Sequence, residues 1–316
     1  MKRRKIALYA LAVVLGLPTV AGLITVGWMS ILDDASGQVV TSGRAREYLL
    51  YVPPTYDPST PTPLVISLHS GALWPAHQRN LSGWNRLADE HGFLVVYPSG
   101  TAEVLGVAKV WHTFAIGPEL SEDVKFIDEL IDELQSRYDI DPARIYADGM
   151  SNGGGMAFAL SCALAQRVAA VGMVAPAQAL PPSWCTPSRP VPTVVFHGTA
   201  DPIVPYDGGP LGIAFAPVET PLPPIRDFVA AQASRNGCAA EPEESAAAPT
   251  VTRRAYEHCA GEAEVILYTI DGAGHAWPGG KPLPQWWIGP NTDAIDATSQ
   301  IWAFFERHPR ARDTRP

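Results

Sequence analysis

Short continuous apolar runs recur along most of this chain of 316 residues, and amphipathic segments separate them. Such runs are expected of strands that are buried on both faces of a sheet. They cover residues 64–68, 93–97, 145–147, 169–174, 193–196 and 265–270, with an edge strand expected at 46–52. Helices are expected over residues 121–138, 152–166 and 294–307, the first of them capped by Ser121. This alternation predicts an α/β protein with a mostly parallel sheet and helices on both faces.

The organisation of the chain follows from shifts in composition. The expected parts are a targeting segment at 1–30, a polar linker at 31–44, one large domain at 45–309 and a tail at 310–316. Two tracts, at 207–224 and 241–249, are expected to be surface excursions. The formal net charge is −9 and no long basic run lies outside the N-terminus, so nucleic acid is not an expected partner.

Four basic residues at 2–5 precede an apolar stretch at 6–29. A cleaved signal peptide is one interpretation, although Thr19-Val20-Ala21 is a poor cleavage site. An uncleaved membrane anchor is the other, because the stretch is long enough to span a bilayer. Both interpretations place the following domain outside the cytoplasm, either secreted or anchored to the outer face of the cytoplasmic membrane. Contact with the membrane is expected only through residues 6–29.

The chain has 4 cysteines, and an even number in an exported protein favours disulfides. Three pairings are possible, and proximity in the sequence favours Cys162 with Cys185 and Cys238 with Cys259. Four buried free thiols are the alternative. A zinc site is disfavoured, because no two of these cysteines have the close spacing of a zinc ligand pair.

The strongest chemical motif is Gly149-Met150-Ser151-Asn152-Gly153, between a predicted strand and a predicted helix. This context is typical of a nucleophile elbow, a turn so tight that the residues two before and two after the serine must be small. The serine hydroxyl would then project at a helix N-terminus, where a backbone N–H can stabilise an oxyanion. The alternative is a glycine-rich turn that happens to hold a serine. The motif predicts Ser151 as a nucleophile.

A nucleophilic serine needs a base, and His275 is the best placed of the 8 histidines, in a glycine-containing loop after the last predicted strand. A carboxylate must orient that base, and Asp201 directly follows the strand at 193–196. Asp207 and Asp271 are rivals; Asp271 would share the loop of His275 and ranks lower. A carboxylate that only caps a turn is the alternative for Asp201. The chain order serine, aspartate, histidine matches a known arrangement of the catalytic triad.

An oxyanion site needs two donors. The backbone N–H of Asn152 is predicted to be the first. The second is expected after the first buried strand, where Gly71 is the choice and Ala72 the next candidate. His69 and His197 each end a predicted strand and are expected to be structural.

With these motifs the chain resembles a family of esterases. That family includes short-chain polyhydroxybutyrate depolymerase-like proteins, feruloyl esterases and LpqC-type exported esterases. The matching stretches are residues 92–98, 141–146, 149–154, 197–206 and 274–279, spread over most of residues 45–308. The resemblance implies an α/β-hydrolase fold, the same triad and paired cysteines. Two features differ from the family: His69 is followed by Ser70 before Gly71, and the tract at 210–224 is atypical.

The expected activity is hydrolysis of carboxylic esters, small or polymeric, through an acyl-enzyme on Ser151. Neither a metal nor an organic cofactor is implied. Trp277, with Trp286 and Trp287, is predicted to line a cleft for a polymer or an aromatic acyl group, although packing beneath the C-terminal loop is the alternative. Two other functions stay open: an exported peptidase of the same fold, and a non-catalytic cell-surface binding protein.

Overall fold

The structure, a computed structural model, describes residues 35–104, 108–212, 221–281 and 284–311. The predicted signal peptide or anchor at 1–30 lies outside these ranges. Within them, none of the helices combines the length and the apolar character that crossing a membrane requires.

In the described part of the chain, ten strands form one sheet in the order β1-β2-β4-β3-β7-β8-β9-β12-β11-β10. The strands are β1 (Gly37–Thr41), β2 (Arg44–Tyr51), β3 (Thr62–Leu68), β4 (Leu94–Pro98), β7 (Ile140–Met150), β8 (Val171–Val174), β9 (Thr193–Gly198), β10 (Glu243–Ala248), β11 (Val251–Tyr256) and β12 (Val265–Ile270). The six neighbouring strands β4, β3, β7, β8, β9 and β12 pair in parallel. Antiparallel pairs extend the sheet at both edges. A separate hairpin consists of β5 (Thr101–Val104) and β6 (Ala108–Val110).

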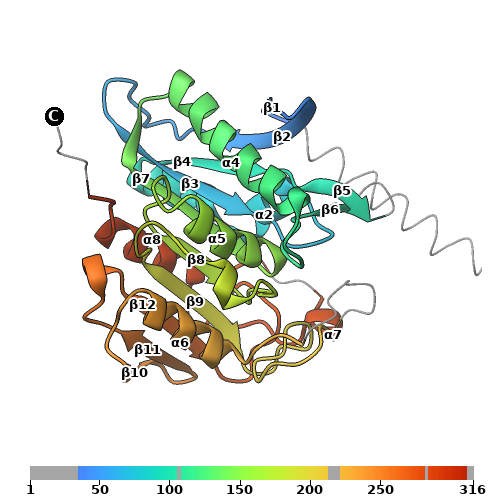
Figure 1. Cartoon of the computed structure of the whole chain (residues 1–316), viewed down its shortest axis with the longest axis vertical. Helices are drawn as coiled ribbons and strands as arrows, with labels where there is room; N and C mark the ends of the chain where they lie inside the picture. Colours follow the sequence, from blue (N-terminus) through green and yellow to red (C-terminus); the bar gives the residue numbers. More distant parts are fainter. Residues whose placement is uncertain (1–34, 105–107, 213–220, 282–283, 312–316) are drawn as a thin grey trace, which may run out of the picture.

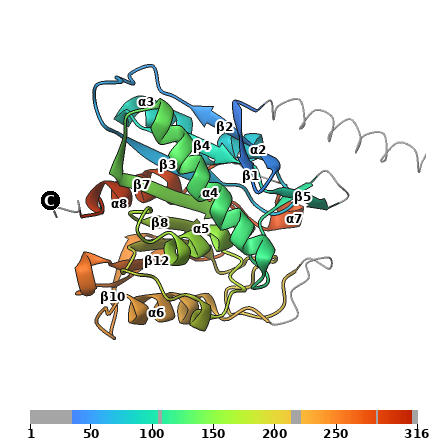
Figure 2. The same cartoon turned by 45° about the horizontal axis from the view of Figure 1, so that its top comes forward.

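Helices cover both faces of the sheet (Figures 1 and 2). One face carries α4 (Pro118–Arg137), α5 (Asn152–Ala163) and α6 (Ile225–Arg235), and the other carries α2 (Pro75–Ser82), α3 (Trp84–His91) and α8 (Ala297–Arg307). In β3, Leu64 and Ile66 pack into the core beneath α4 and α5, whereas Val65 packs into the core beneath α3 and α8. Most positions of the central strands are therefore apolar, and the predicted α/β fold is confirmed.

Two predicted boundaries were wrong. The expected linker at 31–44 contains β1, which forms a hairpin with β2 because Ser42 and Gly43 adopt the positive φ angles of a tight two-residue turn. The helix predicted from Ser121 begins one turn earlier at Pro118, whose ring suits the first helical position and lacks the N–H that would be unpaired there. The Ser121 hydroxyl instead donates to the Gly117 carbonyl.

The expected surface excursion at 241–249 is also wrong, because it forms edge strand β10, paired with β11. β10 is alanine-rich and largely exposed, so neither strand propensity nor an apolar face marks it in the sequence. Its pairing with β11 satisfies backbone groups that an isolated loop would leave to water.

The predicted cysteine pairs are confirmed: Cys162 is bonded to Cys185, and Cys238 to Cys259. The first bridge ties the end of α5 to the loop before β9. The second ties Cys238, three residues after the end of α6, to the segment between β11 and β12. Both bridges therefore fasten connections to the same half of the sheet.

We expect that replacing either pair by alanine lowers the free energy of unfolding by roughly 3 kcal/mol, because each bridge restricts the unfolded chain. The closed loops have similar sequence separations of 23 and 21 residues, so the two losses should be similar. Urea unfolding of wild type and both double variants measures them. Unfolding midpoints equal to that of wild type would contradict the expectation.

Candidate active site

Ser151 occupies the turn between β7 and α5. Its backbone angles are φ 56° and ψ −119°, a conformation that residues with a side chain rarely adopt. The N–H of Ser151 donates to the Val174 carbonyl at 2.9 Å, and its carbonyl accepts from Ala177 N–H at 2.9 Å. The strained turn is thus held by β8 and the loop after it, and the serine remains only half-buried.

Two glycines allow this turn to close. A Cβ on Gly149 would lie 2.4 Å from the Gly153 carbonyl oxygen, and a Cβ on Gly153 would lie 2.3 Å from the Leu68 carbonyl oxygen. Both obstructing atoms belong to the backbone, so no side-chain rotation could make room. The requirement for small residues on each side of Ser151, expected of a nucleophile elbow, is present in this turn.

His275 and Asp201 form a buried hydrogen-bonded pair. His275 Nδ1 lies 2.7 Å from Asp201 Oδ2, and the residues are 5% and 6% exposed. Asp201 Oδ1 accepts the N–H groups of Ile203 and Val204, each at 2.8 Å. Burial raises the pKa of Asp201, but His275 and His197 outweigh burial and hold that pKa well below its usual range. The ionised carboxylate accepts the Nδ1 hydrogen, which leaves Nε2 of His275 able to take a proton.

The rival carboxylates lie elsewhere. Asp271 is exposed and accepts a hydrogen bond from Thr199 Oγ1 at 3.1 Å. Asp207 is exposed as well. Of the three aspartates considered, the structure brings Asp201 to His275. Nowhere in the described ranges do three or more His, Cys, Asp or Glu side chains gather in a group that could hold a metal ion.

The parallel strands β7, β9 and β12 are followed by Ser151, Asp201 and His275. All three residues therefore lie at the end of the sheet where the parallel strands have their carboxyl ends. A small apolar cluster joins the loops that carry them. Its members are Ala177, Ile203, Val204, Leu222, Ala276 and Ile288. Ala177 is hydrogen-bonded to Ser151, two members follow Asp201, and one follows His275. The cluster therefore packs the three loops against one another.

The backbone around Gly71 is oriented by His69. His69 Nε2 accepts the Gly100 N–H at 2.9 Å, so the ring hydrogen is on Nδ1, which donates to the Ser70 carbonyl at 2.8 Å. Burial lowers the pKa of His69 to about 4, which agrees with a neutral ring. Since the carbonyl and the N–H of a trans peptide point in opposite directions, the Gly71 N–H points away from His69.

The two oxyanion candidates differ in their partners. Ala72 N–H donates to the Lys109 carbonyl at 2.8 Å and is therefore occupied. No hydrogen bond engages the Gly71 N–H within the described ranges. A Cβ on Gly71 would lie 3.2 Å from Asn152 Cβ, so this backbone touches the start of α5, where N–H groups have no partner within the helix. Gly71 and Asn152 are thus adjacent, and Ala72 is the weaker candidate.

The side chain of Asn152 holds the segment at 111–113, called the strap below, through hydrogen bonds that the sequence did not reveal. Its Oδ1 accepts the Trp111 N–H at 2.7 Å, and its Nδ2 donates to the Trp111 carbonyl and to Thr113 Oγ1, each at 2.9 Å. Trp111 is fully buried, and its indole N–H donates to the His69 carbonyl at 3.1 Å. These partners are about forty residues apart in sequence, so no local pattern predicts them.

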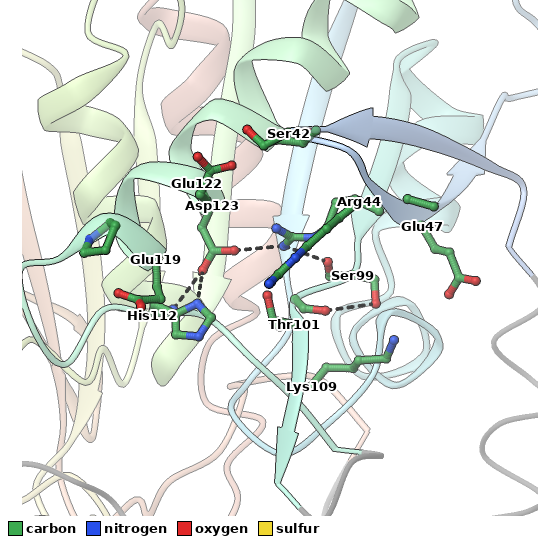
Figure 3. A pocket seen from close by; sticks show the side chains of 15 residues that line it. Ser42, Arg44, Glu47, Ser99, Thr101, Lys109, His112, Glu119, Glu122 and Asp123 are labelled. Carbon is green, nitrogen blue, oxygen red and sulfur yellow. Dashed lines mark hydrogen bonds and ion pairs between the residues drawn. The ribbon is translucent and has the colours of Figure 1, made fainter.

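A polar pocket of about 550 Å³ is lined in part by His112 of this strap, and Figure 3 shows its side chains. Buried Asp123 lies between Arg46, at 2.8 Å, and His112, whose Nδ1 is 2.9 Å away. The His112 N–H also donates to Asp123. The pocket contains none of the proposed triad residues. His112 directly follows Trp111, so its contacts with Asp123 also fix the backbone next to Trp111.

The prediction that Trp277 lines a substrate cleft was wrong. Trp277 is 1% exposed, and its indole N–H donates to Thr298 Oγ1 at 2.8 Å, so it packs in the core beneath α8. Trp286 and Trp287, in the short helix α7 (Gln285–Ile288), are 88% and 47% exposed. The Ile288 carbonyl of that helix accepts the His275 N–H at 2.6 Å. The accessible indoles are therefore those beside the histidine loop.

Asp148, three residues before Ser151, is fully buried on the face of β7 that packs against α3. It accepts hydrogen bonds from the Trp84 indole and from the Ser67 hydroxyl. Its other oxygen has no partner within the described residues. Burial raises the pKa of Asp148 to about 8, so at neutral pH this carboxyl group is protonated and uncharged.

This group should make stability depend on pH. Between pH 4 and 8 the folded state keeps the Asp148 proton that the unfolded state has lost, so its contribution to stability falls as the pH rises. The slope approaches about 1.4 kcal/mol per pH unit. We expect Asp148→Asn to gain stability relative to wild type across this window, with the difference levelling off above pH 8. Urea unfolding at several pH values tests this, and a difference that does not change with pH would contradict it.

The sequence is similar to known esterases. Residues 46–178 match the family described as esterase PHB depolymerase. NocK of Nocardia uniformis subsp. tsuyamanensis, which is named as an esterase, is 33% identical over 77% of this chain and 74% of its own length. Feruloyl esterase B of Piromyces equi is 31% identical over 75% of this chain but only 44% of its own length.

Solved structures share the fold. The acetyl xylan esterase from Aspergillus awamori has a TM-score of 0.57 at 15% identity, covering 85% of this chain and 98% of that one. An S-formylglutathione hydrolase from Agrobacterium tumefaciens has a TM-score of 0.51 at 14% identity, covering 86% and 94%. At these identities the likeness concerns the fold alone. With an α/β-hydrolase fold and these relatives in sequence, the chain belongs to the PHB depolymerase family of esterases.

Proposed function

We propose that this esterase is a serine carboxylic ester hydrolase that works through an acyl-enzyme outside the cytoplasm. The observation that carries the proposal is the buried bond of 2.7 Å between Asp201 and His275, on loops packed against the strained turn of Ser151. Membership of an esterase family supports ester hydrolysis. Two disulfides fit an oxidising compartment.

In this mechanism His275 Nε2 takes the proton of Ser151 Oγ as the oxygen attacks the ester carbonyl. Asp201 holds the Nδ1 hydrogen and stabilises the imidazolium that forms. The backbone N–H groups of Gly71 and Asn152 stabilise the oxyanion, because they are fixed donors that need no reorganisation. His275 then protonates the leaving alcohol, and water releases the acid by the same route in reverse.

The substrate class we propose is an ester with a bulky or polymeric group, bound partly on α7. Several relatives are named feruloyl esterases, and exposed indoles provide flat apolar surface next to the histidine loop. A panel of para-nitrophenyl esters of increasing chain length, methyl ferulate, a hydroxybutyrate oligomer and matched amides tests the proposal. Turnover of the amides at the ester rate would favour a peptidase, and no turnover of any would favour a non-catalytic binding protein.

We expect Trp286→Ala to raise the KM for methyl ferulate about fivefold, equivalent to roughly 1 kcal/mol of lost aromatic contact. Para-nitrophenyl acetate, whose acyl group has no aromatic ring, should be unaffected. Val40→Ala is the matched control, because Val40 is 64% exposed on the edge strand β1, away from the triad loops. An equal effect on both esters, or the same effect from Val40→Ala, would contradict this role for Trp286.

A further inference from the structure

We propose that His197 is a positioning residue for the acid of the triad, a role that rests on the proposed function: its single Nε2–H holds both Asp201 and the loop that carries it. His197 is the next-to-last residue of β9, and its side chain is fully buried. Its Nε2 lies 2.9 Å from the Val204 carbonyl oxygen and 3.4 Å from Asp201 Oδ2. The sequence alone indicated only a structural histidine here.

The hydrogen bonds determine which ring nitrogen of His197 carries the hydrogen. A carbonyl oxygen can only accept, so the contact with Val204 places the hydrogen on Nε2. His197 Nδ1 is buried and has no hydrogen-bond partner among the described residues. A hydrogen on Nδ1 would therefore be a buried donor without an acceptor, which is costly. The neutral ring with Nε2–H fits this environment.

The same N–H acts at two points of one short loop. Between His197 and Val204 the chain leaves β9, presents Asp201 and returns, so that Val204 N–H also donates to Asp201 Oδ1. His197 thus holds Val204, where the loop comes back, close to the end of β9. Asp201 Oδ2 is left facing two histidines, with the short bond to His275 and the longer contact to His197. This arrangement limits rotation of the carboxylate away from His275.

The surroundings of His197 keep its ring in place. Tyr206 packs edge-on against it, with ring centroids 5.8 Å apart, and the Tyr206 hydroxyl bonds to Thr269 Oγ1 on β12 at 2.7 Å. Thr269 is the residue paired with His197 across the β9–β12 ladder. The Tyr206 ring, which is fixed to β12 through its hydroxyl, therefore holds the imidazole in its position near the end of β9.

The test compares His197→Met, which keeps the volume but has no N–H, with His197→Gln, whose amide reaches the position of Nε2. We expect His197→Met to lower kcat on para-nitrophenyl acetate about tenfold with KM unchanged, since one shared bond to a charged group is lost. His197→Gln should stay within about threefold of wild type. The control is His308→Met, which makes the same replacement at a histidine whose Nδ1 bonds to the Phe304 carbonyl, and it should keep its kcat.

The decisive arm repeats His197→Met in an Asp201→Ala background. If His197 acts through Asp201, the second change should lower kcat no further, because residues that work as a unit are not additive. An equal tenfold loss there, or a folded His197→Met enzyme with normal kcat, would overturn the inference. Should His197→Met fail to fold, His197→Asn replaces it: its shorter amide should lose activity where Gln keeps it. If the kcat of the wild type were no higher than that of Ser151→Ala, the result would contradict the proposed function, and with it this role of His197.

Discussion

Ser151→Ala is expected to lower kcat on an activated ester by at least about a thousandfold, while the protein stays folded. Ser151 is the one side chain at the strained turn that could form the acyl-enzyme, and alanine cannot form that bond. The turn itself should survive, because it depends on Gly149, Gly153 and the bonds to Val174 and Ala177, none of which involves the hydroxyl.

Ser161→Ala is the matched control for this variant. Ser161 lies in α5, the helix that follows Ser151, and its hydroxyl donates to the Phe158 carbonyl within that helix. Its loss should leave kcat unchanged. Ester turnover near the wild-type rate by a folded Ser151→Ala protein would remove the acyl-enzyme mechanism, although the family and the fold would stand.

Asp201→Asn is expected to lower kcat about a thousandfold or more, equivalent to about 4 kcal/mol of transition-state stabilisation. Asp201 Oδ2 accepts the Nδ1 hydrogen of His275 at 2.7 Å. An amide can present its NH₂ group to Nδ1 instead and so favour the wrong imidazole tautomer, with Nε2 protonated and unable to act as a base. His275→Ala should be damaged to a similar degree, and the double variant only slightly more.

Asp271→Asn and Asp207→Asn serve as controls for this prediction. Both carboxylates are exposed, and Asp271 pairs with Thr199 rather than with the histidine. Each variant should keep nearly full kcat on the same ester, after thermal unfolding has shown that it is folded. If Asp271→Asn were crippled while Asp201→Asn stayed active, the acid would be Asp271, and the serine esterase proposal would survive with a different triad.

Much of the fold was accessible from the sequence, because central parallel strands are buried on both faces and carry apolar residues at most positions. β12 has the predicted bounds, and β3 and β9 each extend their predicted runs by two residues. Edge strands lack this signal. β1 has one solvent-facing side and β10 is almost entirely exposed, so the sequence predicts a linker at the first and a surface excursion at the second.

For the site, local patterns in the sequence predict the types of residue and their order. A serine between small residues, a histidine among glycines and an aspartate after a buried strand are local patterns, since each depends on its own turn. The cysteine pairs were also indicated locally, because each joins positions only 21 or 23 residues apart.

Features that depend on contacts between distant segments became visible in the folded chain. Trp277 and Trp286 look alike in the sequence, but packing beneath α8 buries the first and leaves the second exposed. The choice of Gly71 over Ala72 rests on a bond from Ala72 to the Lys109 carbonyl, far along the chain. His197 belongs to the triad's support only because its loop folds back onto it. Hydrogen bonds and burial of this kind arise between elements that the fold brings together, so no single stretch of sequence contains them.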